Sequence, residues 1–183
     1  PERIGAADII IVTKCPTYID DQQREKWASN LGIKQYDPAT GTGTRKKGKK
    51  QHILFTSIAY DTAKPIFPEG DPRYLYAKRL ILFSGIANDA PLARFLSGTY
   101  KIVKHFNFPD HHKFSRGDIM AIRDAGDAFP TSVIMTTEKD CQRVRDSKAV
   151  PESLKQRMFY APIKTEFLRQ EDQDKFKSIL KEL

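Results

Sequence analysis

The sequence RLILFSGIANDAPLARFLSGTYKIVKHF, residues 79–106, decides the fold class of this chain. An apolar run over 79–84 predicts a strand that is covered on both faces, as in a parallel sheet. Residues 85–88 predict a tight turn, and Pro91 suits the first turn of the helix that follows. A second apolar run over 100–106 predicts another strand, so the segment is a βαβ unit.

The same alternation continues on both sides of this unit. A strand over 8–13 is followed by a helix over 19–31, with Asp20 or Asp21 as its N-cap and Gly32 as its stop. Further elements are strands over 52–60, 131–136 and 158–167, and helices over 115–128, 138–145 and 172–183. We therefore expect an α/β fold with a mostly parallel sheet and flanking helices.

Two segments without hydrophobic periodicity interrupt the pattern. Residues 37–50 contain mainly Pro, Gly, Thr and Lys, a composition that predicts a loop. Residues 61–72 contain Pro65, Pro68 and Pro72, which predict a rigid connector without helix.

Length and composition limit the class of protein. A chain of 183 residues with 39% hydrophobic residues and a mean hydropathy of −0.54 is long enough for one domain or two small ones. No run approaches the roughly 18 apolar residues of a membrane-spanning helix, and no secretory signal is visible. Cys15 and Cys141 lack the spacing of a structural zinc site and favour a reducing compartment. The chain opens on Pro1, as a chain cut from a longer one would.

The net charge of +8 comes largely from one segment. Without its five cations the remaining chain carries only +3. We expect a solvated loop, and binding of nucleic acid or anionic lipid by a stand-alone module remains an alternative. The five cations are Arg45, Lys46, Lys47, Lys49 and Lys50.

This basic loop imitates a phosphate-binding motif. Residues 43–49 match G-x-x-x-x-G-K, but the next position, which must carry a hydroxyl for Mg²⁺, is Lys50. The segment also enters a predicted strand, whereas a phosphate loop opens a helix whose N-terminus faces the phosphates. We therefore do not expect a phosphate cradle here.

The triplet Asp110-His111-His112 is the first candidate site. It lies in a loop after a predicted strand, where open α/β sheets place ligands. A histidine beside a carboxylate suits proton transfer. An exposed turn is one alternative, and a metal-dependent phosphoesterase is another. The latter needs further acidic residues on earlier strands, and the sequence has no Asp-x-Asp upstream of the triplet, only Asp172-Gln-Asp174 in the last predicted helix.

Two further strand ends carry polar residues. Thr13-Lys14 follows the first strand, where a lysine can flank a nucleotide base. The segment 136–140, Thr-Thr-Glu-Lys-Asp, is explained by ordinary N-capping through Thr137, with acidic residues in the first helical turn.

Taken in order, these segments resemble the tetraacyldisaccharide 4′-kinase family of lipid A biosynthesis, and specifically its C-terminal portion. The closing segments FYAPI, residues 159–163, and TEFL, residues 165–168, also match the family. The motifs that carry the resemblance are ADIIIVTKC at 7–15, LFTSIAY at 54–60, SGIAN at 84–88, FPDHHKF at 108–114 and TTEKD at 136–140.

The resemblance implies the C-terminal half of a two-domain P-loop-type kinase. The family transfers the γ-phosphoryl group of ATP to the 4′-hydroxyl of tetraacyldisaccharide 1-phosphate. Its phosphate loop, Mg²⁺ ligands and catalytic Asp belong to the N-terminal half, so this chain alone is expected to be inactive and to hold no metal. Residues 1–50 are expected to be the tail of the nucleotide-binding domain with the basic loop. Residues 51–183 are expected to be a C-terminal α/β domain, with a two-stranded connector near 53–60 and 158–167.

The resemblance also implies residue roles and partners. His111 matches the family's Asp-His motif, in which the histidine pairs with the catalytic Asp to help accept the hydroxyl proton. Asp110 is expected to orient the imidazole, and Thr13 and Lys14 to contribute to cofactor binding. The partners implied are ATP, the acylated glucosamine disaccharide lipid and a membrane surface, with no nucleic acid. The implied location is peripheral, at the cytoplasmic face of the bacterial inner membrane, with this portion soluble by itself.

Overall fold

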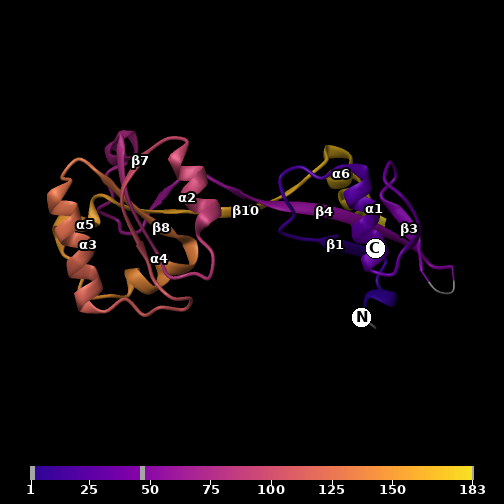
Figure 1. Ribbon diagram of the computed structural model, residues 1–183, viewed down its shortest axis with the longest axis horizontal. Helices are drawn as coiled ribbons and strands as arrows, with labels where there is room; N and C mark the ends of the chain where they lie inside the picture. The colour runs from indigo at the N-terminus through magenta and orange to yellow at the C-terminus, as the bar shows by residue number, and fades with distance from the viewer. Residues whose placement is uncertain (1–2, 46–47, 183) are drawn as a thin grey trace. The chain divides into compact units, whose positions relative to one another are not determined.

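The computed structural model describes residues 3–45 and 48–182. The chain forms two compact units, whose elements are labelled in Figure 1. Unit 1 contains the residues up to Ala59 and those from Lys164 onward, and unit 2 contains Tyr60–Ile163. The chain passes between the units twice, after Ala59 and after Ile163.

Unit 1 is built on a mixed sheet with strand order β1-β4-β3-β2, in which β10 also pairs with β4. β1 runs parallel to β4, whereas β3 is antiparallel to both β4 and β2. The sheet is therefore only partly parallel. Its elements are η1 (Arg3–Gly5), β1 (Ile9–Val12), α1 (Asp21–Asn30), β2 (Lys34–Asp37), β3 (Thr42–Thr44), β4 (Lys50–Tyr60), β10 (Ile163–Phe167) and α6 (Gln170–Glu182).

Helix α1 has the predicted N-cap, Asp20, and spans Asp21–Asn30, so it begins two residues after and ends one residue before the predicted bounds of 19–31. Asp20 accepts a hydrogen bond from the Gln23 N–H at 2.7 Å, and the Gln23 side chain accepts one from the Asp20 N–H at 3.0 Å. This reciprocal capping box satisfies two N–H groups that the helix itself leaves unpaired. Gly32, at φ +74°, turns the chain away after the last helical turn.

The prediction of a loop over 37–50 is wrong in part. Strand β2 ends at the first residue of this segment, and β3 lies within it. These short strands are held by backbone pairing with each other and with β4, so they need no hydrophobic period. Gly43 allows a close approach, since a Cβ there would lie 2.3 Å from Ile33 Cγ2. The G-x-x-x-x-G-K match therefore joins two antiparallel strands, and Lys46 and Lys47 lie outside the described residues.

Unit 2 contains the mostly parallel sheet that the sequence predicts. Its strand order is β5-β9-β8-β6-β7, and only β5 is antiparallel to its neighbour. Its elements are β5 (Lys64–Pro65), η2 (Pro72–Tyr76), β6 (Arg79–Ser84), α2 (Ala90–Ser97), β7 (Lys101–Asn107), α3 (Arg116–Ala128), β8 (Val133–Thr137), α4 (Glu138–Arg145), α5 (Glu152–Lys155) and β9 (Met158–Ala161).

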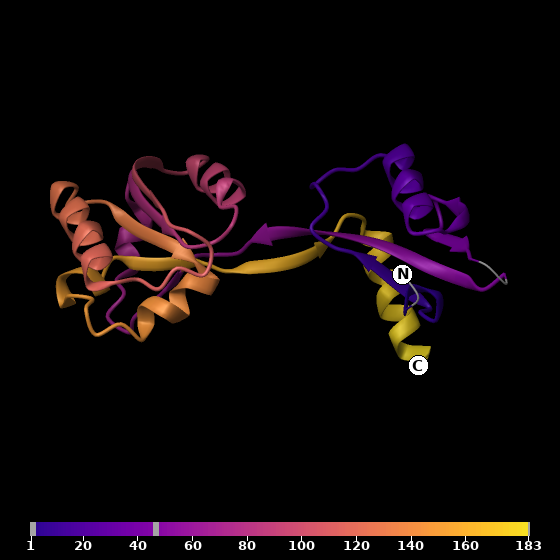
Figure 2. The same cartoon turned by 60° about the horizontal axis from the view of Figure 1, so that its bottom comes forward.

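Strand β6 lies between β8 and β7 in this sheet and is covered on both faces. Leu80 and Leu82 pack with apolar residues of α2, whereas Ile81 and Phe83 pack with residues of α3, α4 and α5. Alternate side chains of a strand point to opposite faces, so helices cover the sheet on each side (Figure 2). Because β6, β7 and β8 are parallel, the loops after their carboxyl ends meet at one edge of the sheet.

The division of the chain differs from the one expected at residue 50. β4 runs without a break from Lys50 to Tyr60, and its first half pairs with β1, so residues 51–59 belong to unit 1. The chain returns to unit 1 at Lys164. Of the two strands expected to form a connector, the one over 53–60 lies in β4. The one expected over 158–167 is divided into β9, which belongs to the sheet of unit 2, and β10, which pairs with β4.

The closing helix α6 belongs to unit 1 and begins at Gln170, two residues before the predicted start. Phe176 on this helix packs against Phe167 of β10, with ring centroids 5.4 Å apart. Asp172 is buried and lies 3.4 Å from the Arg24 guanidinium. None of the described helices combines the length and apolar character needed to cross a bilayer.

Candidate functional site

The loop after β7 holds Asp110 and His111 beside the turn that follows β6. The Phe108 N–H donates to the Ser84 carbonyl at 2.8 Å, and the His111 N–H donates to the Gly85 carbonyl at 3.1 Å. Asp110 Oδ1 also accepts from the His111 N–H, at 2.9 Å. His111 has φ +63°, in the left-handed region of backbone conformation that residues other than glycine seldom adopt. The side-chain bond from Asp110 and the backbone bond to Gly85 stabilise this conformation.

The imidazole of His111 is exposed and faces two basic side chains of α4. Arg143 Nη2 lies 3.3 Å from Nδ1, and Lys139 Nζ lies 3.4 Å from Nε2. Asp110 Oδ2 lies 3.5 Å from Nε2, which is an ion-pair distance and too long for a hydrogen bond. The expectation that Asp110 orients the ring is therefore incomplete, because the nearest groups to both ring nitrogens come from α4.

Asp110 forms its closest side-chain contact with Lys139, whose Nζ donates to Oδ1 at 3.0 Å. This hydrogen bond, together with the charges of Lys139 and His111, holds the pKa of the Asp110 carboxyl below its usual value. Asp110 is thus a carboxylate at neutral pH and supplies negative charge next to the imidazole.

A buried carboxylate, Asp140, fixes the elements around His111. It accepts hydrogen bonds from the Gly85 N–H at 2.8 Å, from the Thr137 hydroxyl at 2.7 Å and from Arg143 Nη1 at 2.8 Å. A buried charge costs free energy unless it is paired and hydrogen-bonded, and Asp140 meets both conditions. Thr137 also caps α4 through the Asp140 N–H, as the sequence predicts. The TTEKD segment therefore does more than N-capping, because it links α4 to the turn after β6.

The side chain of His112 has different contacts from that of His111. Its Nε2 lies 2.9 Å from Asp118 Oδ2, and its ring stacks on Phe108 with centroids 4.5 Å apart. Burial raises the pKa of the Asp118 carboxyl, but hydrogen bonds from His112 and Ser115 outweigh this and hold the pKa below its usual value. His112 thus anchors the loop to the capping box of α3, formed by Ser115 and Asp118.

The geometry does not favour a metal-dependent phosphoesterase. Within residues 3–45 and 48–182, no three His, Cys, Asp or Glu side chains gather as metal ligands. Lys139 and Arg143 also lie against Asp110 and His111, and two cations oppose the binding of a third.

Thr13 and Lys14, the residues expected to contribute to cofactor binding, follow β1 in unit 1. Both are exposed, and Lys14 adopts φ +59°. The next residue returns to the sheet, because the Cys15 N–H donates to the Thr56 carbonyl at 2.9 Å. Thr13 and Lys14 therefore belong to a different unit from Asp110 and His111, and their role in nucleotide binding stays a prediction.

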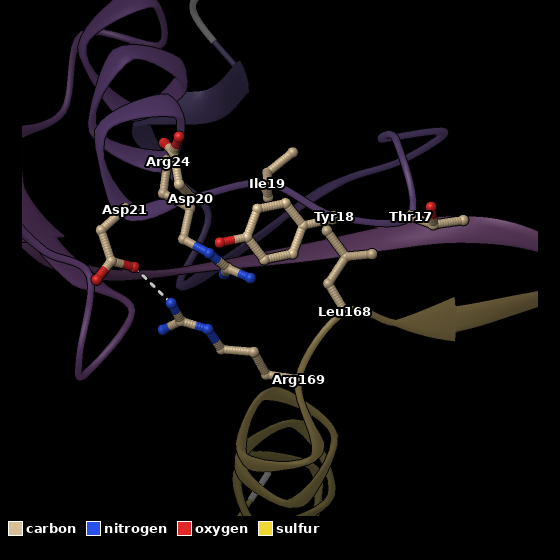
Figure 3. Close-up of a pocket in the computed structure, with 8 residues that line it drawn as sticks. All are labelled: Thr17, Tyr18, Ile19, Asp20, Asp21, Arg24, Leu168 and Arg169. Carbon is tan, nitrogen blue, oxygen red and sulfur yellow. Dashed lines mark hydrogen bonds and ion pairs between the residues drawn. The ribbon is translucent and has the colours of Figure 1, made fainter.

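Unit 1 contains a cavity of about 320 Å³ (Figure 3). Its lining begins at Thr17, shortly after Thr13-Lys14 in the sequence. Arg24 contributes to it, with a side chain only 3% exposed that contacts Asp172 and lies over the Phe55 ring at 5.0 Å. Arg169 forms an ion pair with Asp21, drawn as a dashed line in Figure 3. Each of the two arginines is paired with a carboxylate. The lining residues are Thr17, Tyr18, Ile19, Asp20, Asp21, Arg24, Leu168 and Arg169.

The sequence analysis named Lys139 only as part of the segment 136–140, and it did not single out Arg143 or the cavity. A signal for the first two was present, because residues four apart lie on one face of a helix and both are basic. The cavity gave no such signal, since α1 and the segment 168–169 come from opposite ends of the chain.

Comparison with known proteins agrees with the motifs. A family model described as tetraacyldisaccharide-1-P 4′-kinase matches residues 1–183. The tetraacyldisaccharide 4′-kinase of Parabacteroides distasonis is 30% identical over 168 residues, which are 88% of this chain and 42% of that protein. The corresponding protein of Phocaeicola vulgatus is 30% identical over 178 residues, or 94% of this chain and 44% of that protein.

This chain thus spans less than half the length of these two relatives. A crystal structure of LpxK from Aquifex aeolicus in complex with ATP superposes with a TM-score of 0.45 and 12% identity, covering 94% of this chain and 51% of that one. Because the family model matches residues 1–183, the chain belongs to the tetraacyldisaccharide-1-P 4′-kinase family.

Proposed function

We propose that this chain supplies an acid–base histidine, His111, to an ATP-dependent kinase that phosphorylates the 4′-hydroxyl of tetraacyldisaccharide 1-phosphate in lipid A biosynthesis. The observation that carries the proposal is the placement of His111, exposed at the carboxyl edge of a parallel sheet with a carboxylate and two cations around it. Membership of the kinase family supports the choice of reaction.

In the proposed reaction, the 4′-hydroxyl oxygen forms a bond to the γ-phosphorus of ATP. The bond from that phosphorus to the β,γ-bridging oxygen breaks, and its electron pair stays with ADP. The hydroxyl proton leaves as the new bond forms, and His111 assists its removal together with a carboxylate of the other half of the enzyme. The exposed side chain of His111, 72% accessible, suits a group that acts on a partner outside unit 2.

The segment of this chain that imitates a phosphate loop does not have the context that such a loop needs. Residues 43–50 join two antiparallel strands instead of opening a helix, and no described set of three acidic, His or Cys side chains gathers as ligands. Phosphoryl transfer depends on a phosphate cradle and a metal for positioning and charge neutralisation. The chain therefore needs the N-terminal half that proteins of its family contain. Thr13 and Lys14 would then flank the bound nucleotide.

The substrate proposed for the kinase also determines its location. A tetraacylated disaccharide is held in a membrane, so the enzyme acts as a peripheral protein at the cytoplasmic face of the bacterial inner membrane. The basic loop would face the anionic lipid head groups there, which attract Lys and Arg. Nucleic acid is not a partner in this proposal.

The test uses a kinase that joins this chain to the N-terminal half of its family. His111→Ala should lower kcat by about 10²–10⁴, the range for lost acid–base assistance, with KM for ATP little changed. Lys113→Ala, an exposed cation on the same loop, is the control and should retain full activity. An unchanged kcat in His111→Ala would remove the proposed role. This chain alone should show no ATP-dependent phosphorylation of the lipid, and turnover by it would contradict the need for a second half.

A further inference from the structure

The two faces of the sheet in unit 2 are covered unequally. Residues of α3, α4 and α5 pack on one face. On the opposite face, the described helices that contribute to the core are α2 and the short η2. A helix with its side chains is about 10 Å wide, whereas the five strands of this sheet, spaced about 4.8 Å apart, span roughly 19 Å. Helix α2 therefore leaves part of this face to other residues.

A cavity of about 330 Å³ lies beside α2 on this face. Its lining includes Met135 of β8, Ala161 of β9 and the segment 60–63 at the beginning of unit 2. The Asp61 N–H donates to the Pro162 carbonyl at 2.9 Å, which holds this segment against the end of β9. The lining residues all lie within unit 2, so this unit forms the cavity by itself.

The cavity has an apolar floor and a polar rim. Leu96, Met135 and Ala161 are at most 3% exposed and belong to the apolar core on this face of the sheet. The polar lining residues, Asp61, Thr62 and Thr99, are exposed. Ligand sites in proteins combine an apolar lining with a small number of polar groups. The arrangement suits a ligand that has an apolar part and a polar part.

Two stacked aromatic rings border the cavity. The ring centroids of Tyr60 and Phe95 lie 4.8 Å apart. Phe95 remains 48% exposed, although it is one of the largest apolar side chains. An apolar ligand against this ring would remove its exposed surface from water, which is favourable.

The volume of the cavity fits a chain of carbon atoms. An apolar cavity of about 150 Å³ accommodates benzene, so one of about 330 Å³ has room for roughly twelve carbon atoms. The lipid in the proposed function has apolar acyl chains joined to a polar sugar. Its acyl chains match the floor of the cavity, and its sugar matches the rim.

The cavity extends to the edge of the sheet at which His111 lies. Ala161 is the register partner of Thr137, the residue that caps α4. Close to Ala161 in the chain, the Ile163 N–H donates to Glu138 Oε2 at 3.2 Å, and Glu138 is the first residue of α4. The end of α4 that carries Lys139, a neighbour of the His111 imidazole, is therefore next to one side of the cavity.

Positive charge surrounds the cavity. Lys64, Arg94 and Lys101 are exposed, and each adjoins a lining residue in the sequence. Cations near the rim suit a lipid that carries a phosphate group.

We propose that this cavity binds one acyl chain of the lipid substrate, with the chain on the apolar floor and the sugar at the rim, toward His111. The identity of the ligand rests on the proposed function. The presence of an acyl-binding cavity does not, because it can be measured in this chain without any kinase activity.

The first test is carbon-13 NMR of the methionine methyl groups in this chain. Its methionines are Met120, Met135 and Met158. Met135 lines the cavity, whereas Met158 packs in the core on the opposite face of the sheet. The probe is N-decanoylglucosamine, kept below the concentration at which it forms micelles. It should shift the Met135 methyl signal in a saturable way and leave that of Met158 unchanged.

The length of the acyl chain should determine the affinity. Each buried CH₂ group strengthens binding about three- to fourfold, so N-decanoylglucosamine should bind about tenfold more tightly than N-octanoylglucosamine. N-acetylglucosamine, which offers the sugar without the chain, should not shift the Met135 signal.

Two variants of the lining should weaken binding of the decanoyl probe at least tenfold. Phe95→Asp removes the exposed ring and adds a charge, and Ala63→Trp fills part of the cavity from its rim. Ser97→Asp is the matched control, because Ser97 is also exposed in the last turn of α2 but does not line the cavity. An unchanged Met158 signal shows that each variant is folded.

Four results would overturn the proposal. They are an unmoved Met135 signal, an equal shift with N-acetylglucosamine, an equal shift at Met158, and binding that neither lining variant weakens. A Met135 signal that instead changes with protein concentration would show that a second copy of the chain covers the cavity, which would also overturn it.

The second test assigns the cavity to the substrate and uses the kinase that contains both halves. Phe95→Asp should raise KM for tetraacyldisaccharide 1-phosphate about tenfold, with kcat and KM for ATP unchanged, because it removes binding that the ground state and the transition state share. Ser97→Asp should change none of these constants. An unchanged KM for the lipid in Phe95→Asp would overturn the assignment.

These outcomes separate the two proposals. If His111→Ala leaves kcat unchanged, the proposed role of His111 fails, and the methionine signals still decide whether the cavity binds an acyl chain. If His111→Ala lowers kcat but Met135 does not respond to the acylated probes, the acyl-binding cavity fails alone.

Discussion

The carboxylate of Asp140 accepts a hydrogen bond from the backbone N–H of Gly85 at 2.8 Å, across 55 positions of sequence. This bond joins the first turn of α4 to the turn after β6. The Gly85 carbonyl in turn accepts from the His111 N–H at 3.1 Å. The exposed loop that carries His111 is therefore attached to a fully buried charged group.

Asp140→Ala should destabilise the protein by about 2–3 kcal/mol, because it leaves the Gly85 N–H and the Thr137 hydroxyl without their acceptor. Urea unfolding at neutral pH measures the change. Asp146→Ala, an exposed carboxylate at the end of the same helix, is the control and should alter stability by less than about 0.5 kcal/mol. Equal losses of stability in the two variants would show that the hydrogen bonds of buried Asp140 contribute no more to stability than an exposed carboxylate does.

The pair His112 and Asp118 should make stability depend on pH in the acid range. The pKa of Asp118 is lower in the folded state, so its contribution is fully present above the ordinary carboxyl pKa of about 3.9 and is lost as pH falls through the folded pKa. Asp118→Asn should therefore reduce the loss of stability between about pH 5 and pH 3, as measured by urea midpoints at each pH. Asp127→Asn, on the exposed side of α3, is the comparison. If both substitutions change the loss of stability between pH 5 and pH 3 equally, Asp118 is not the source of this pH dependence.

Two glycine substitutions should change stability in opposite directions. Gly43→Ala would place a Cβ 2.3 Å from Ile33 Cγ2, and such overpacking costs about 1–3 kcal/mol. Gly117→Ala lies in the first turn of α3, where the new Cβ meets Ser115 Oγ at an ordinary 3.6 Å. It should stabilise by about 0.5–1 kcal/mol, because alanine loses less backbone entropy in a helix. Thermal unfolding of both variants measures the difference, and a stable Gly43→Ala protein would contradict the close packing of β3.

The basic loop should bind anionic membranes in a salt-sensitive way. Cosedimentation with phosphatidylglycerol vesicles at low salt should be lost when its five cations are replaced by Gln, since each Lys or Arg near such a surface contributes about 1 kcal/mol. Lys101→Gln with Lys104→Gln on β7 is the control for loss of charge elsewhere. Neutral phosphatidylcholine vesicles should not bind the protein. If anionic vesicles do not bind it either, the membrane role of the loop is excluded.

Elements with local signals were predictable from the sequence. Helices α1 and α3 follow from their capping residues, Asp20 and Ser115, which act through neighbours three positions away. Strands β2 and β3 were missed because β2 pairs with β3 and β3 pairs with β4, and short strands with the sequences KQYD and TGT have no apolar pattern. The unit boundary was misplaced for a related reason, since β4 continues beyond the point where the composition changes.

By itself, the sequence determined the βαβ pattern around residues 79–106, the family motifs and the choice of Asp110 and His111 as candidates. Tertiary structure alone decided which groups surround the imidazole. Lys139 and Arg143 lie about 30 residues further along the chain, and only the parallel pairing of β6 with β7 and β8 brings α4 to the same sheet edge. Local capping and hydrophobic period act over a few residues, whereas the environment of His111 depends on hydrogen bonds between loops that only the folded sheet places together.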